Sequence, residues 1–191
     1  MPVTINGNGS ITGISAGGLP SGSLTLSKTD MPAGTVIQCV TDTTTAKTDN
    51  NGNSYVAING LSVTMTPRAS NSKFYAIFEG HFYVDYGGSG SNSSHGIGYN
   101  IYKDGTRFTT SPNDSGGGEN SERPYDWYND GAHRTVARLM KTGQGTFGST
   151  SAATFTVKFK AYYANSNYTV KLNENGADET QAQLTVMEIA A

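Results

Sequence analysis

Histidines and acidic residues are the side chains whose types could support catalysis or metal binding in this sequence. His81 lies in a strand-like segment, His95 in a glycine- and serine-rich segment, and His133 just before another strand-like segment. None of them has the short spacing that zinc ligands show, and no group of cysteines joins them. We therefore expect no metal site and no cofactor, and we expect His81 to be a surface or subunit-interface residue.

A pair of carboxylates could hydrolyse a polysaccharide, and the polar segment 111–133 is the place where such a pair would lie. Glycosidases hold two carboxyl groups about 5 to 9 Å apart across a groove. A loop flanked by glycines is a poor frame for that geometry, so we expect solvated acids and no enzyme activity. A polysaccharide depolymerase remains the less favoured alternative, and its acids would be Glu119, Glu122, Asp126 and Asp130.

The aromatic residues of the same segment give the best indication of a binding site. Their flat apolar faces stand among hydrogen-bonding side chains, which suits stacking on sugar rings and also suits protein contacts. In the alternative interpretation, Trp127 packs over the edge of the domain or contacts another subunit. The candidate receptor-binding residues are Arg123, Tyr125, Asp126, Trp127, Tyr128, Asn129 and Asp130.

The elements that must position these residues are strands. Apolar and polar residues alternate in one segment after another, as in residues 61–66 and 74–85, and no stretch of ten residues has helical periodicity. Asp104-Gly105 predicts a two-residue hairpin turn, and Asn59-Gly60 indicates a bulge or kink between two short strands. The polar segment 42–54 is expected to be a loop. The sequence predicts an all-β sandwich or jelly roll of about eight to ten strands over residues 35–191.

Charge and composition exclude several classes of protein. The net charge is -2, and the 13 basic residues are dispersed, so we expect no nucleic-acid partner. The single cysteine, Cys39, excludes an internal disulfide, and we expect it to be a small buried strand residue. No apolar run approaches the length of a membrane span, and the N-terminus lacks the pattern of a secretory signal, so we expect neither membrane insertion nor a cleaved leader.

The N-terminal segment 1–34 has a different composition from the strand-like body. Its apolar residues are isolated among Gly, Ser, Thr and Asn, so one copy cannot bury enough surface to offset the entropy of ordering its glycines. Three copies around an axis could bury these residues mutually, or the segment could lie as an extended arm on a neighbouring protein. The candidate assembly residues are Ile5, Ile11, Ile14, Leu19, Leu24 and Leu26.

The body resembles a known family, on three segments and their order. These are GLSVTMTPRASNSKFYAIFEGHFYV, YNIYKDGTRF and the terminal QLTVMEIAA, preceded by the glycine-rich ITGISAGGLPSGSLT. The chain resembles the trimeric jelly-roll heads, similar to the tumour necrosis factor architecture, that occur in bacteriophage fibre and tail-associated proteins. The resemblance implies a homotrimer with apolar sheet faces near its axis. It also implies a central last strand with a buried acid, as in Met187-Glu188-Ile189.

The sequence and the resemblance together lead to a functional hypothesis. We expect a bacteriophage virion structural protein, a tail-fibre or tail-tip component that mediates host attachment by receptor binding as a homotrimer. Its partners would be other copies of itself, further virion proteins through segment 1–34, and a host surface glycan or protein. The main alternative is a capsid decoration protein, in which the head reinforces or projects from the capsid.

Overall fold

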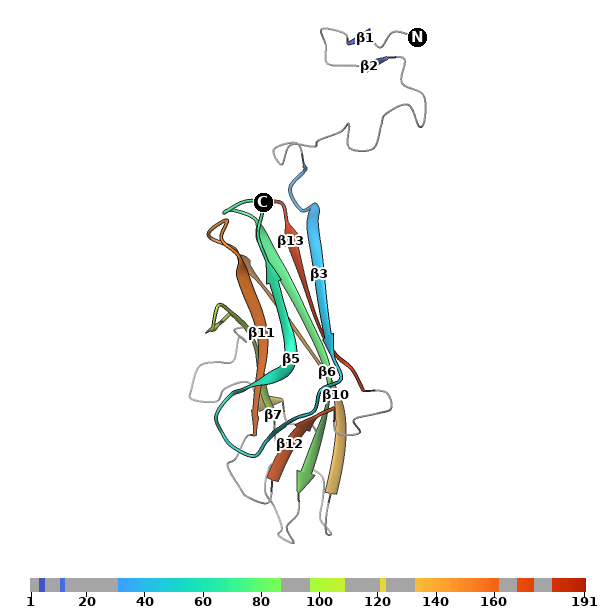
Figure 1. Cartoon of the computed structure of the whole chain (residues 1–191), viewed down its shortest axis with the longest axis vertical. Helices are drawn as coiled ribbons and strands as arrows, with labels where there is room; N and C mark the ends of the chain where they lie inside the picture. The colour runs from blue at the N-terminus through green and yellow to red at the C-terminus, as the bar shows by residue number, and fades with distance from the viewer. Residues whose placement is uncertain are drawn as a thin grey trace. The chain divides into compact units, whose positions relative to one another are not determined.

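The computed structural model is built of β-strands joined by turns and loops (Figure 1). The structure describes residues 4–5, 11–12, 31–86, 97–108, 121–122, 133–161, 168–173 and 180–191. Within these residues every regular element is a strand. The chain divides into two units, Met1–Pro32 and Ala33–Ala191. In the first unit, β1 (Thr4–Ile5) pairs antiparallel with β2 (Ile11–Thr12), which places Ile5 opposite Ile11.

The second unit consists of two antiparallel sheets packed as a sandwich. One sheet has six strands: β3 (Val36–Thr44), β4 (Thr48–Asn50), β6 (Lys73–Tyr86), β10 (His133–Thr146), β12 (Tyr168–Leu172) and β13 (Ala182–Ile189). The other has five: β5 (Val56–Met65), β7 (Ile97–Lys103), β8 (Thr106–Arg107), β9 (Ser121–Glu122) and β11 (Ala153–Ala161).

Strand β6 organises the six-stranded sheet. Its whole length pairs with β10, while its other edge pairs first with β13 and then with β12. Beyond these two, β3 pairs with β13 and β4 with β12. The principal order is therefore β3-β13-β6-β10 in one sheet and β5-β11-β7-β8 in the other. This alternation of the chain between sheets is the jelly-roll order, so the predicted all-β jelly-roll sandwich is confirmed.

The core lies between the sheets and follows from strict alternation along the strands. Alternate residues of β6 and β11 are buried, and Phe82, which packs against Phe78 in the same strand, meets Phe159 of the other sheet edge to face. Burying each such ring contributes about 1.5 to 3 kcal/mol. Gly80 lies on the same face, and the close packing there favours glycine because a Cβ would lie 2.7 Å from Cζ of Phe78. The apolar side that the sequence predicts for residues 74–82 is thus the core side.

Polar side chains close the sandwich along the open edge between β3 and β5. Oδ2 of Asp42 accepts a hydrogen bond from the Ser62 backbone N–H at 2.8 Å, and the Gln38 amide donates to the Thr66 carbonyl at 2.8 Å. Further along, the Thr44 hydroxyl donates to the Asn59 carbonyl, and the Thr48 hydroxyl accepts from the Asn59 N–H. These bonds satisfy backbone groups that edge strands leave unpaired.

Glu188 is a fully buried carboxylate on the core side of β13. Oε1 accepts the backbone N–H groups of Arg68 at 2.8 Å and Ala69 at 3.4 Å, and Oε2 accepts the Gln38 amide at 2.6 Å. Since β13 lies between β3 and β6, the expectations of a buried acid and a central last strand are confirmed. The carboxylate fastens the turn after β5 to the other sheet.

Two expectations about the start of the body are corrected by the structure. The segment 42–54 is not all loop, because β3 extends to Thr44 and β4 follows at Thr48–Asn50, with Thr44, Thr48 and Asn50 buried. The prediction of a buried Cys39 is wrong, since its side chain is exposed. Cys39 pairs with Met187 on the outer side of the sheet, whereas its neighbours Gln38 and Val40 face inward.

The register supports the expected irregularity at Asn59-Gly60, although β5 is one strand rather than two. Pairing with β11 shifts between Thr156 and Lys158, and Gly60 has φ of 68°. The extra residues form a bulge, and a positive φ favours glycine there.

Replacing Glu188 by alanine should remove the carboxylate that accepts the backbone N–H groups of Arg68 and Ala69. We expect Glu188→Ala to lower the free energy of unfolding by about 2 to 4 kcal/mol, measured by urea denaturation. Gln183→Ala, at an exposed position of the same strand, should stay within about 0.5 kcal/mol of the parent. Equal effects of the two changes would contradict the role given to the carboxylate.

Candidate functional site

The hairpin between β7 and β8 shapes the cavity on which a candidate site can be built. Asp104 and Gly105 have φ of 50° and 79°, and Lys103 pairs with Thr106. Positive φ at both central residues defines the two-residue turn whose twist matches the flanking strands. The hairpin turn predicted at Asp104-Gly105 is confirmed.

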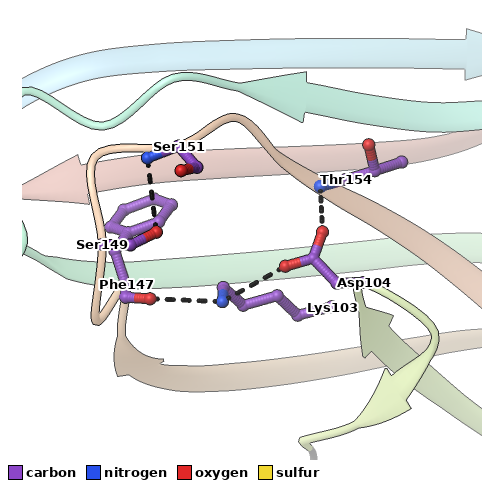
Figure 2. Close-up of polar contacts among 6 residues, drawn as sticks. All are labelled: Lys103, Asp104, Phe147, Ser149, Ser151 and Thr154. Carbon is purple, nitrogen blue, oxygen red and sulfur yellow. Dashed lines mark hydrogen bonds and ion pairs between the residues drawn. The ribbon is translucent and has the colours of Figure 1, made fainter.

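The hairpin tip is bonded to the first residues of β11 and to the segment that precedes this strand (Figure 2). The Thr154 N–H donates to Oδ1 of Asp104 at 2.8 Å, and the Asp104 N–H donates to the Thr154 carbonyl at 2.8 Å. The Lys103 ammonium donates to the Phe147 carbonyl at 3.2 Å and lies 3.3 Å from Oδ2 of Asp104. The single carboxylate therefore holds the backbone and the ammonium at once.

Beside this hairpin lies an open cavity of about 440 Å³. Two aromatic rings, Phe74 and Phe108, stand 4.8 Å apart in an edge-to-face arrangement. Gly145 allows the Phe74 ring to pack directly against the backbone of β10, because a Cβ there would lie 2.6 Å from Cζ of Phe74. The lining residues are Phe74, Lys103, Asp104, Thr106, Phe108, Gly145 and Thr146.

The residues that line this cavity could bind a small ligand, but the described ones do not provide the pair of carboxylates that hydrolysis needs. Ring surface, two threonine hydroxyls and one ammonium suit a small ligand rich in hydroxyl groups. Asp104 is the one carboxylate in the described lining, and both its oxygens are already engaged. Glycoside hydrolysis with two carboxylates therefore finds no second acid among these residues.

A second feature is the outer side of the six-stranded sheet, part of which carries no charge. Two neighbouring cross-strand rows run from β3 over β13 and β6 to β10. Charged residues border them, with Lys73 on one side and the Glu79–Arg138 ion pair on the other. We call the two rows the neutral face: Cys39, Met187, Tyr75 and Gln144, then Thr41, Thr185, Ile77 and Thr142.

Every side chain of the neutral face is at least partly exposed. Tyr75, Ile77 and Met187 are its large members, and Met140 beside it is 62% exposed. His81 lies farther along the same side of β6, also partly exposed, which agrees with the surface position expected for it. The amphipathic second side of residues 75–83 predicted from the sequence thus faces outward.

The predicted receptor-binding residues lie outside the described part of the chain. These are Arg123, Tyr125, Asp126, Trp127, Tyr128, Asn129 and Asp130, and the same holds for Glu119, His95 and the assembly residues Ile14, Leu19, Leu24 and Leu26. The segment 111–133 is not all loop: Glu122 lies in β9, which pairs with β7, and His133 begins β10.

A third group on the outer side of the five-stranded sheet was missed by sequence reasoning. Tyr55, Tyr102, Asn100, Arg107, Lys158 and Lys160 meet there although they come from four parts of the chain. The available signal was the alternation in Phe155–Ala161, which places both lysines on the side opposite the phenylalanines.

Comparisons with known proteins add no relative. No protein-family model matches the sequence, and no curated protein matches it. Within the described ranges the structure holds no helix long and apolar enough to cross a membrane. The same ranges contain no group of three or more histidine, cysteine or acidic side chains placed to hold a metal ion. The fold and these surfaces define an all-β sandwich protein.

Replacing Asp104 should loosen the hairpin through its backbone bond. We expect Asp104→Ala to lower the free energy of unfolding by about 1 to 3 kcal/mol, because the Thr154 N–H loses its acceptor and alanine disfavours a positive φ. Asp104→Asn keeps an acceptor oxygen and tolerates that φ, so urea denaturation should show a clearly smaller loss. Equal losses for the two variants would contradict this account of the turn.

Proposed function

We propose that this chain is a bacteriophage virion structural protein, a tail-fibre or tail-tip component that adheres to the host surface as a homotrimer. The observation that carries the proposal is the neutral face, an uncharged and partly exposed sheet surface on a jelly-roll unit. Three properties lead from this face to adhesion: its chemistry favours association, a rotation axis closes the assembly, and several copies bind the host surface together.

The chemistry of the neutral face favours association. Protein interfaces are depleted of charge at their centres and enriched in tyrosine and methionine. Tyr75 and Met187 are direct cross-strand neighbours, with Ile77 in the next row, and the nearest charges stand at the border. Such an arrangement, with polar or charged residues around an uncharged centre, is typical of a contact surface.

A homotrimer is the assembly that fits both the surface and the resemblance. Most soluble oligomers close by a rotation axis, and a ring of identical chains uses the same surface in each copy. The order β3-β13-β6-β10 opposite β5-β11-β7-β8 supports the resemblance to tumour-necrosis-factor-like heads of phage fibres. In that arrangement the neutral face would turn toward the threefold axis.

The N-terminal unit would attach the head to the virion. Its described strands pair Ile5 with Ile11, and its remaining assembly residues are Ile14, Leu19, Leu24 and Leu26. Three heads on one mount would bind a repetitive host surface with avidity above that of a single site. The receptor contact is proposed at the aromatic residues Tyr125, Trp127 and Tyr128.

A binding role rather than catalysis is part of this proposal. The cavity beside the β7–β8 hairpin contributes one engaged carboxylate from the described residues, which supports recognition over hydrolysis. The depolymerase alternative would need two free acids facing one groove.

The location on the particle tests the proposal. Immunogold labelling with antibodies raised against residues 33–191 should place gold at the tail or its fibres in electron micrographs of the phage that encodes the chain. Gold confined to the capsid would overturn adhesion in favour of capsid decoration. Intact particles without any gold would overturn a virion role, provided that antibodies to a known tail protein label the same preparation.

A further inference from the structure

The cavity beside the β7–β8 hairpin lies at an open end of the sandwich core. Lys103 and Thr106 are cross-strand partners, and Lys103 follows the buried core residue Ile101 by two positions, so both side chains belong to the inner side of the sheet. Phe108 follows Thr106 by two positions and packs against the core. Its N–H donates to the Ile101 carbonyl at 3.4 Å, which continues the hairpin. Alternation along the strands therefore turns an ammonium, a hydroxyl and an aromatic ring toward one space.

This space is accessible from solvent. Its volume of about 440 Å³ lies within the range of about 300 to 1,000 Å³ that is typical of small-molecule sites. Thr106 is exposed, and Lys103 and Phe108 are partly exposed. The side chain of Asp104 is 50% exposed. Behind them, Phe74 is buried and holds the Phe108 ring edge to face at 4.8 Å. A ligand in the cavity would therefore contact Phe108, while Phe74 supports that ring.

The charged groups of the cavity are held in place and balance each other. The Lys103 ammonium lies between the Phe147 carbonyl, 3.2 Å away, and Oδ2 of Asp104, 3.3 Å away (Figure 2). An ammonium has three N–H donors and a carboxylate oxygen can accept more than one hydrogen bond, so both groups can also bond to a ligand. The described lining contains one lysine and one aspartate, so its net charge is zero. This arrangement favours a neutral ligand over an ion.

A sugar ring has the chemistry that complements this lining. Its hydroxyl groups donate and accept hydrogen bonds, which matches the Lys103 ammonium, the Asp104 carboxylate and the Thr106 hydroxyl. Its C–H groups form an apolar patch that can lie on an aromatic ring, and Phe108 provides one. A purely apolar ligand would displace water from the polar groups without replacing the hydrogen bonds of that water.

We propose that this cavity binds one unit of a neutral saccharide, with its C–H groups on Phe108 and its hydroxyl groups on Thr106, Lys103 and Asp104. The described lining residues all belong to one chain, so each copy of the protein carries its own site. This inference deepens the proposed adhesive function and rests on it for its purpose, because it names a neutral saccharide as the host ligand.

Calorimetric titration of the full chain at pH 6 with small probes tests the class of ligand. The neutral probes are the methyl glycosides of glucose, galactose, mannose and N-acetylglucosamine. The controls are methyl glucuronide, which is anionic, methyl glucosaminide, which is cationic, and cyclohexanol, which is largely apolar. We expect at least one neutral glycoside to bind with a dissociation constant of about 1 to 10 mM, and the controls to bind at least about fivefold more weakly.

The other outcomes of this titration each exclude the proposed ligand. No binding of any neutral glycoside in that range would overturn the site. Binding of cyclohexanol as tight as that of the best neutral glycoside would overturn a saccharide in favour of an apolar ligand. Equally tight binding of methyl glucuronide or methyl glucosaminide would overturn a neutral ligand in favour of an ion.

Matched variants locate the binding in the cavity. Phe108→Leu removes the ring and should raise the dissociation constant of the best neutral glycoside about threefold or more, whereas Phe108→Tyr keeps the ring and should change it less than about twofold. Thr106→Val removes the hydroxyl at nearly constant volume and should raise it about threefold or more. Thr43→Val makes the same change at an exposed position of β3 and should change it less than about twofold.

A Thr106→Val variant that binds as the Thr43→Val variant does would overturn the placement of the sugar. Lys103 and Asp104 stay unaltered because they fix the hairpin tip. Thr106 is exposed, so its variant keeps the test valid even where Phe108→Leu weakens core packing. Because affinity is measured per chain with free sugars, failure of the site leaves the labelling result untouched.

Discussion

The backbone groups along the open edge of a two-sheet sandwich must find hydrogen-bond partners, and this chain supplies them from side chains. Asp42 and Thr44 of β3 bind backbone groups of β5, and Glu188 accepts the two N–H groups of the turn that follows β5. Each unmade bond of this kind would cost about 1 to 3 kcal/mol. Because side chains bind these backbone groups at the edge, the phenylalanines can fill the core between the sheets. The same hydrogen bonds fix the position of β3 relative to β5.

That register decides what the two outer sides present. On the six-stranded sheet, side chains alternate so that Tyr75, Ile77 and Met187 point outward in uncharged rows, while Glu79 and Arg138 stand at the border. On the five-stranded sheet the same alternation turns Lys158 and Lys160 outward beside two tyrosines. The two outer sides are therefore chemically different: one carries uncharged rows, and the other carries lysines beside tyrosine rings.

The strands with strong alternation could be predicted from the sequence because apolar and polar residues follow one another with a period of two. The Asp104-Gly105 turn could be predicted because these residue types tolerate a positive φ. The polar strand β4 could not, since Thr48 and Asn50 are buried through hydrogen bonds to distant segments rather than through apolar character. Cys39 was misplaced for a related reason: its side of the sheet follows from pairing with Met187, nearly 150 positions away in the chain. Tyr55, Tyr102, Lys158 and Lys160 come together through long-range pairing of β11 with β5 and β7, and only the alternation of the lysines within β11 indicated this group.

The central claim is that the neutral face joins copies of this chain, and the mass of the protein in solution tests it most directly. Multi-angle light scattering of the full chain should give the mass of three chains of 20.1 kDa each. Ile77→Lys places a charge within the uncharged rows and should give the mass of one chain, while Thr64→Lys, at an exposed position of β5 in the other sheet, should remain a trimer. A single-chain mass for the unaltered protein would contradict the account, and so would a trimer that Ile77→Lys leaves intact.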